Sequence, residues 1–415
     1  MRDTGAPAIG HLVQRQAEDL AVLGNLRLLQ VSAPHVALRH LRRIDDRIAA
    51  HLDALAVAGE EGVRTVERLL ADVGHGEVFA ATLLAIVNGE GGRLERLLAL
   101  AEAVPAAETG LLSAFNFVSA RFLTGMVRDW LRSPHPFRRR VGIAVCAMHG
   151  VDPGAALADA LNDGDAALRA TALRVIGECG LRDRLDACLR AVTDGDEAVR
   201  LQAARSAALL GAGGAGSATL TRVAMHAGPA QAATLRLVLA LADPAAANGL
   251  LATLARTPAH SRALIRGTGQ SGDPHYVAWL IRQMQDVTVA RVAGESFALM
   301  TGLDLAWLDL DLPAPPPSAD DEDDADQEED DGLPWPDPAR IGAWWAAHGA
   351  RFQPGVRYFM GEVPTPAHCR AMLRDGYQRQ RIAAAEYLCL LQPGTRLFPT
   401  AAPAWRQQRW LQRPG

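Results

Sequence analysis

Apolar residues recur at helical spacing along the chain, and the pattern itself repeats about every thirty residues. The stretch 163–180 (DGDAALRATALRVIGECG) recurs at 194–211 (DGDEAVRLQAARSAALLG), with most apolar positions kept. Related copies lie at 133–150, 226–243, 256–273 and 285–302. A fixed period of this length predicts a repeat architecture in which each unit packs on its neighbours.

Each copy predicts one helix with a defined start and end. The copy begins in a turn with Asp or Pro, its seventh residue is usually Arg, and its eighteenth is Gly or Asp. Between them, Ala172, Leu173 and Ile176 follow the 3.6-residue period. The rest of each period predicts a second, shorter helix, for example at 185–192. Two helices per period are the unit of an α-solenoid, so we expect an all-α chain.

The copies resemble HEAT repeats of the short variety, which carry an Asp…Val-Arg…Ala…Leu-Gly signature. Asp163 with Arg169, and Asp194 with Arg200, match it best. In that family the Asp and Arg side chains form a ladder between neighbouring repeats. The resemblance therefore implies a structural ladder at Arg138, Asp163, Arg169, Asp194, Arg200, Arg262, Arg291, Asp375 and Arg381. The alternative is an anion-binding stripe along the solenoid.

Composition divides the chain into four predicted segments. Residues 1–72 form an N-terminal helical region, and 73–303 a HEAT-like or armadillo-like solenoid. Residues 304–333 contain a proline run and ten acidic residues within 320–331 with no basic neighbour. Such a block cannot bury enough apolar area to offset chain entropy, which predicts a disordered insertion. Residues 334–415 are expected to form a C-terminal helical cap that includes a terminal repeat.

Charge narrows the range of functions. All 42 basic residues are arginine, which excludes P-loop lysines, Schiff-base lysines and Ser–Lys dyads. The formal net charge is −5, but without the ten acidic residues of the insertion the remainder carries +5, from 42 basic and 37 acidic residues. Clustered opposite charges attract at short range. We therefore predict that the acidic insertion lies back across an arginine-rich groove and is displaced when a partner binds.

Residues that could carry chemistry are scattered. The stretch GAGGAG at 211–216 matches G-x-G-x-x-G, but it follows a helix and lacks a βαβ unit, so an inter-helical turn is expected. The histidines lack the i,i+4 spacing of a zinc site, and the five cysteines form no CxxC pair. We expect no catalytic residue, no metal and no cofactor.

With neither a signal-peptide pattern nor an 18-residue apolar run, we expect a cytoplasmic chain with reduced thiols and no membrane span.

The segments outside the clearest copies share further features with one family. These segments are 40–60, 297–304, WPDP at 335–338, RYFMG at 357–361 and GYQRQRIAAAE at 376–386. They resemble a bacterial family of HEAT-repeat proteins that are often encoded near type VI secretion genes, and the resemblance runs from about residue 11 to residue 408. It implies a cytoplasmic accessory role, such as handling a secretion effector or spike component. That family offers no established catalytic residues to carry over.

The favoured hypothesis is a non-enzymatic scaffold or adaptor that holds a protein partner on the concave face of the solenoid. Arg174 and Arg205 recur on neighbouring repeats and suit an acidic or mixed partner. Trp335, Trp344 and Trp345 are further candidates, because tryptophan and arginine dominate interface energetics; their alternative role is packing within the cap. The competing hypotheses are a HEAT-like lyase and a nucleic-acid-binding protein with an arginine-rich groove. A pI of about 6.2 and the acidic insertion argue against nucleic acid.

Overall fold

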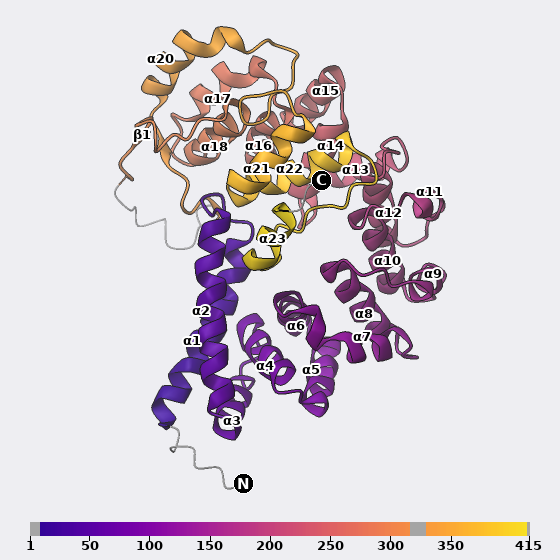
Figure 1. The fold of residues 1–415 in the computed structure, drawn as a ribbon. Helices are drawn as coiled ribbons and strands as arrows, with labels where there is room; N and C mark the ends of the chain where they lie inside the picture. The colour runs from indigo at the N-terminus through magenta and orange to yellow at the C-terminus, as the bar shows by residue number, and fades with distance from the viewer. Residues whose placement is uncertain (1–8, 316–328, 413–415) are drawn as a thin grey trace. The chain divides into compact units, whose positions relative to one another are not determined.

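The computed structural model describes residues 9–315 and 329–412, and within them the chain is built almost entirely of α-helices (Figure 1). The predicted all-α, solenoid-like class is confirmed, because helices that are neighbours in the sequence pack in pairs. Packing divides the chain into two units. Unit 1 comprises Met1–Ser32, Val36–Val175 and Pro399–Gly415, and unit 2 comprises Ala33–His35 and Ile176–Phe398. These units differ from the four segments that composition predicts.

Unit 1 is formed by the first ten helices and the last one. Its helices are α1 (Gly10–Gln30), α2 (Leu38–Val57), α3 (Glu60–Leu69), α4 (His75–Val87), α5 (Gly91–Ala103), α6 (Pro105–Phe117), α7 (Thr124–Leu131), α8 (Pro136–His149), α9 (Ala155–Ala160), the first part of α10 (Ala166–Glu178), and α23 (Ala404–Leu411). Leu20 and Phe79 are buried in its apolar core. There Arg27 of α1 pairs with Asp45 of α2 at 2.6 Å. The Ala404 backbone N–H also donates to Asp45, which fixes the start of α23.

Unit 2 carries the later repeats and the long C-terminal segment. Its helices are the end of α10, then α11 (Leu185–Ala191), α12 (Glu197–Leu209), α13 (Ser217–Met225), α14 (Gln231–Leu241), α15 (Pro244–Leu254), α16 (Ser261–Ser271), α17 (Val277–Gln283), α18 (Ala290–Thr301), α20 (Pro338–His348), α21 (Pro366–Asp375) and α22 (Gln378–Leu391). Helices α12, α14, α16 and α18 pack side by side in one row. Each also packs against the helix that precedes it.

The starts and ends of the repeat helices follow the chemistry of the sequence. The carboxylates of Asp165 and Asp196 accept the backbone N–H of the residue three positions on, at 2.8 and 3.0 Å, and so cap α10 and α12. Gly180, Gly211 and Gly302 follow the helices with φ of 69°, 96° and 75°, a left-handed conformation that glycine adopts without strain. The predicted glycine ends are confirmed at these positions.

At two of the predicted helix ends, the aspartate in the eighteenth position begins the next helix. In the copy at 226–243, α14 ends at Leu241, and Asp243 instead caps the start of α15 by accepting the Ala246 N–H at 2.8 Å. In the copy at 256–273, Gly272 is the residue with positive φ, and Asp273 accepts the N–H of His275 at 3.0 Å. An aspartate placed between two closely spaced helices therefore begins the second helix rather than ending the first.

The predicted insertion at 304–333 has described flanks with defined structure. A two-stranded antiparallel ribbon pairs β1 (Asp311–Leu312) with β2 (Trp335–Pro336). The end of the proline run and most of the acidic block fall at 316–328, outside the described residues. Glu329, Asp330 and Asp331, the last acidic residues of the block, are described and contact the helical array. Sequence composition alone gave no sign of the ribbon or of this contact surface.

The C-terminal segment lies along the array of unit 2. Helix α20 packs against α17, at the last repeat, where a cap is predicted. Helix α22 instead contacts α12 and α14 (Figure 1). Its Tyr387 and Arg379 side chains contact α16 and α18. The backbone N–H groups of Tyr358, Met360 and Leu397 donate to carbonyls at the ends of α16, α18 and α10 within this unit. The segment thus supplies partners for the row of helix ends.

Replacement of Gly302 by alanine is expected to cost more stability than the same replacement at Gly355. Both glycines have positive φ, at 75° and 79°, where a Cβ costs about 1–2 kcal/mol. A Cβ on Gly302 would lie 2.6 Å from the carbonyl oxygen of Met360, whereas one on Gly355 meets no atom within 4 Å. Urea unfolding should show an additional loss of at least about 1 kcal/mol for Gly302→Ala. Equal losses would contradict this close approach.

Candidate functional site

Four arginines of unit 2 meet the end of the acidic block. Arg262 and Arg266 lie on α16, and Arg291 and Arg379 lie in the first turns of α18 and α22. Because Arg262 and Arg266 are four residues apart on one helix, their side chains share a face. We call Arg262, Arg266, Arg291 and Arg379 the arginine cluster. Glu329 and Asp330 form ion pairs with Arg262 and Arg266 of the array. That the whole acidic insertion lies across a groove and is displaced by a partner stays a prediction.

The contacts of the acidic residues are close, and Asp330 is the most deeply buried of the three. A carboxylate oxygen of Asp330 lies 2.6 Å from Nη2 of Arg262 and 3.6 Å from Nη2 of Arg266, and the Asp330 side chain is only 3% exposed. Glu329 lies 2.6–2.7 Å from two guanidinium groups: its carboxylate pairs with Arg266, and its carbonyl oxygen accepts from Arg379. Arg291 donates to the Asp330 carbonyl oxygen at 3.4 Å. The cluster therefore holds both side chains and backbone of an acidic segment.

Burial and charge act on the carboxylates of this site in opposite directions. For Glu329, burial disfavours the charged form, but the hydrogen bond and charge of Arg266, with the charges of Arg379 and Arg262, outweigh it and hold the pKa below its ordinary value. For Glu295 of α18, burial prevails and raises the pKa despite Arg379, whose guanidinium lies 2.7 Å away. The Glu295 carboxyl group, beside Arg379 of the cluster, therefore takes up a proton at a higher pH than an ordinary glutamate does.

Helix α22 is fixed to the array by a second set of charges. Glu386, which is 4% exposed, accepts two hydrogen bonds from Arg236 of α14 at 2.7 and 3.0 Å. It also lies 3.9 Å from Arg205 of α12. The Tyr387 hydroxyl donates to the Gln270 carbonyl oxygen at 3.4 Å, and burial raises the pKa of Tyr387 to about 12. One buried carboxylate therefore links α22 to two neighbouring repeats.

Arg357 closes the end of α14 and was not singled out by the sequence pattern. Its guanidinium donates to the carbonyl oxygens of Leu239, Ala240 and Ala242 at 2.7, 2.5 and 2.5 Å. It also reaches the Ser271 carbonyl oxygen of α16 at 3.3 Å. The last carbonyls of a helix lack partners within the helix and carry partial negative charge, so a guanidinium suits them.

The seventh-position arginines of the clearest copies bind the loops that start their own copies. Arg169 donates to the carbonyl oxygens of Asp163 and Gly164 at 2.8 and 3.1 Å. Arg200 does the same with the corresponding carbonyls, those of Asp194 and Gly195, at 2.7 and 2.9 Å. These contacts lock each Asp-Gly-Asp loop against its helix. The ladder between neighbouring copies stays a prediction.

The other predicted ladder residues lie in varied surroundings. Arg138 pairs with Glu95 at 2.5 Å, while its neighbour Arg139 pairs with Asp163 of the next copy at the same distance. Asp375 is exposed at the end of α21. Arg381 is fully buried in α22, where it donates to the Leu373 carbonyl oxygen at 2.8 Å, and burial lowers its pKa to about 10. Even so, its guanidinium stays charged at neutral pH.

The residues predicted to contact a partner are partly buried. Arg174 lies half-buried on α10, and Arg205 is 3.4 Å from Glu178. The Arg291 guanidinium stacks over Trp335 at 4.8 Å. Trp344 and Trp345 set their rings edge-on to Phe297 of α18, with centroids 6.3 and 6.2 Å away. The tryptophans thus pack within unit 2, and a role in partner binding stays a prediction.

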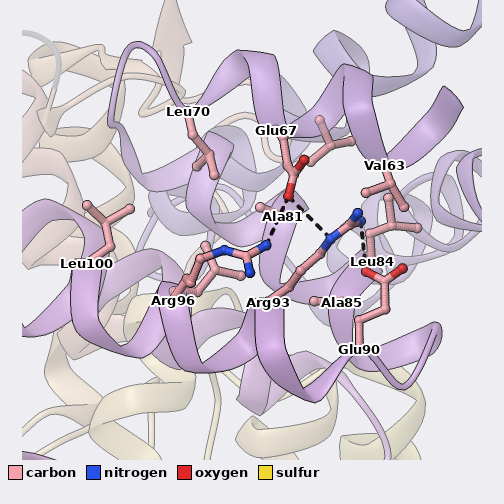
Figure 2. Close-up of a pocket in the computed structure, with 12 residues that line it drawn as sticks. Val63, Glu67, Leu70, Ala81, Leu84, Ala85, Glu90, Arg93, Arg96 and Leu100 are labelled. Atoms are coloured by element: carbon pink, nitrogen blue, oxygen red, sulfur yellow. Dashed lines mark hydrogen bonds and ion pairs between the residues drawn. The ribbon is translucent and has the colours of Figure 1, made fainter. Parts of the chain in front are cut away.

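Unit 1 contains an apolar pocket (Figure 2). It holds about 110 Å³ between α3, α4 and α5, and leucines and valines form its walls. Figure 2 shows Glu67 directed at Arg93 and Arg96, at 3.2 and 3.4 Å, with Arg93 also bound to Glu90 at 2.9 Å. Every charged residue of the lining is therefore paired. Its volume is below the roughly 300 Å³ of typical ligand sites.

Reactive groups do not converge in the described ranges. No three His, Cys, Asp or Glu side chains there form a group that could hold a metal ion. Burial raises the pKa of Cys188 and Cys389 to about 12, so these thiols stay protonated at neutral pH. The GAGGAG stretch at 211–216 joins α12 to α13, as predicted for an inter-helical turn. No helix in the described part combines the length and apolar character needed to cross a bilayer.

Comparison with known proteins identifies the repeats. A family model for HEAT repeats matches residues 154–242, which include the copies with the clearest Asp and Arg positions. No curated protein and no solved structure matches the chain. The likeness to HEAT repeats thus covers the central part of the array, and such repeats generally serve protein–protein interaction.

Removal of the Glu386 carboxylate is expected to destabilise unit 2 strongly. Glu386→Ala leaves Arg236 partly buried without its partner, a change that costs roughly 3–5 kcal/mol. The control is Glu197→Ala, since Glu197 forms an exposed pair with Arg222 at 2.9 Å that contributes about 0–1 kcal/mol. Chemical unfolding should separate the two variants, and hydrogen exchange in α22 should rise for Glu386→Ala alone. Similar losses in both would show that Glu386 does not anchor α22.

The stabilising effect of Glu329 is expected to depend on pH. Because its folded pKa lies below its ordinary value of about 4.5, ionised Glu329 stabilises the fold above that value. This contribution is lost as pH falls through the folded pKa. Wild type should therefore be more stable than Glu329→Gln at pH 7, and the difference should shrink toward pH ~3.5 in urea unfolding. A difference that is the same at both pH values would contradict the assigned ion pair.

Proposed function

We propose that the protein is a non-enzymatic scaffold that holds a protein partner along its helical array. The observation that carries the proposal is the array itself, in which HEAT-like helix pairs follow one another with a regular period. Such stacking creates an extended face rather than a closed catalytic cavity. A further support is that the row α12, α14, α16 and α18 already binds a long segment of its own chain through ion pairs and helix-end contacts.

Within this role we propose an accessory task near a type VI secretion machine, with an effector or spike component as the partner. The support is the resemblance of flanking segments such as 335–338 and 376–386 to a bacterial family encoded near such genes. The cytoplasm is the compartment that such a task implies. We retain Arg174, Arg205, Trp335, Trp344 and Trp345 as proposed partner contacts, because arginine and tryptophan carry much of the energy of protein interfaces.

Co-purification from the native host tests the scaffold. Tagged full-length protein should retain a partner at about 0.15 M salt, and the purified partner should rebind in a defined ratio. The double variant Arg174→Ala/Arg205→Ala should weaken this binding at least about tenfold, since it removes two charges from adjacent repeats. Arg190→Ala, an exposed arginine of α11, is the control that should bind as wild type does. If no protein rebinds, the scaffold proposal is wrong.

A further inference from the structure

The arginine cluster borders a cavity that its own acidic residues do not line. The cavity holds about 280 Å³ beside α14 and α16, close to the lower size of ligand sites at about 300 Å³. Arg262, Arg266 and Gln270 line it, and they are spaced four residues apart on α16. This spacing places them in one stripe along the helix. Leu235 and Pro258 add apolar groups to its lining.

The acidic residues of the chain leave part of this stripe unsatisfied. The buried Nε of Arg266 and the buried Oε1 of Gln270 have no hydrogen-bond partner among the described residues. Asp330 reaches both arginines through the same carboxylate oxygen, although a guanidinium can bind a carboxylate through two parallel hydrogen bonds. An unmade hydrogen bond of a buried polar group costs about 1–3 kcal/mol. A ligand that supplied both a carboxylate and an N–H donor would therefore gain contacts here.

A peptide with acidic side chains has the chemistry that the stripe lacks. Its carboxylates could bind Arg266, and a backbone N–H could donate to Gln270. The chain itself demonstrates this mode of binding nearby, because Glu329 contributes both a carboxylate and a backbone carbonyl to the cluster. A phosphate group carries oxygen acceptors but no N–H donor, so it would leave the Oε1 of Gln270 without a partner. The site therefore favours an acidic peptide over a polyphosphate.

We propose that Arg262, Arg266 and Gln270, with the adjoining cavity, form a docking site for an acidic segment of a protein partner. In the absence of that partner, Glu329 and Asp330 bind the arginines of the site. This inference rests on the proposed scaffold function and specifies the chemistry of its partner. Glu329 is 46% exposed and Asp331 80% exposed, so the segment can be approached from solvent and exchanged.

Competition within one chain sets the expected affinities. A tethered ligand acts at an effective concentration in the millimolar range, so a peptide in solution must compete with Glu329 and Asp330. Replacing these two residues by Gln and Asn removes the competing carboxylates and leaves the side-chain sizes unchanged. The variant Glu329→Gln/Asp330→Asn should therefore bind an acidic peptide more tightly than wild type does. Wild type should bind it at least about tenfold more weakly.

The experiment uses the full chain and a synthetic peptide. The probe copies residues 326–333 (DQEEDDGL), and the matched control peptide carries Gln and Asn in place of the residues corresponding to Glu329 and Asp330. Calorimetry at about 0.05 and 0.15 M salt should show that the probe binds the double variant, more tightly at low salt. The control peptide should bind at least about tenfold more weakly. Adding Arg266→Ala to the variant should abolish binding.

Other outcomes would overturn the proposal. Equal binding of the probe to wild type and double variant would place its site elsewhere, and no binding to either would make the acidic contact purely structural. If an oligothymidylate displaced the probe at similar concentration, the ligand class would be phosphate rather than an acidic protein. If the double variant did not fold, Glu329→Gln, which keeps the Asp330–Arg262 pair, would carry the same comparison. Probe binding without any host partner would reject the scaffold but retain the site.

Discussion

The row of helix ends is the constraint on which the rest of the structure depends. Each helix finishes with carbonyl oxygens that have no partner within the helix, and stacked repeats bring many such ends together. In unit 1 Arg406 binds the carbonyl oxygens of Asn116 and Val118, each at 2.7 Å. In unit 2 Arg357 performs the same task at α14, and backbone N–H groups serve the ends of α10, α16 and α18. The C-terminal segment is thus part of the array.

The exclusive use of arginine fits this constraint. A guanidinium presents five N–H donors in a fixed plane, so one side chain can bind several oxygens at once. Arg357 uses this capacity on four carbonyls, and Arg236 uses it on the two oxygens of Glu386. A lysine ammonium is a compact point charge that could not span these acceptors in the same geometry. Arginine therefore serves both as a helix-end cap and as a carboxylate receptor.

The features that could be predicted from the sequence are those that depend on residues close together in the chain. Helix periodicity, the aspartates at helix starts and Gly180, Gly211 and Gly302 at helix ends all depend on neighbours within a few residues. The position of α22 could not be predicted in this way, because Glu386 meets Arg236 across 150 residues of sequence and no repeat pattern relates the two. The net charges of insertion and array predicted their attraction, but charge alone does not select Arg262 or Arg266. Which arginines meet the acidic residues depends on how α16 and α18 pack side by side.

The degeneracy of the later repeats has a physical consequence for these arginines. In the copies with an Asp-Gly-Asp loop, the seventh-position arginine binds the loop carbonyls of its own copy, as Arg169 and Arg200 do. The copy at 256–273 begins instead with Arg-Thr-Pro-Ala-His, whose last three residues form a 3₁₀ turn. There Arg262 donates to the Thr288 carbonyl oxygen of the following copy and pairs with Asp330. Loss of the loop signature thus redirects a structural arginine toward a carboxylate from elsewhere in the chain. In this solenoid, the copy that lacks the loop signature is therefore the one whose seventh-position arginine pairs with an acidic residue of the insertion.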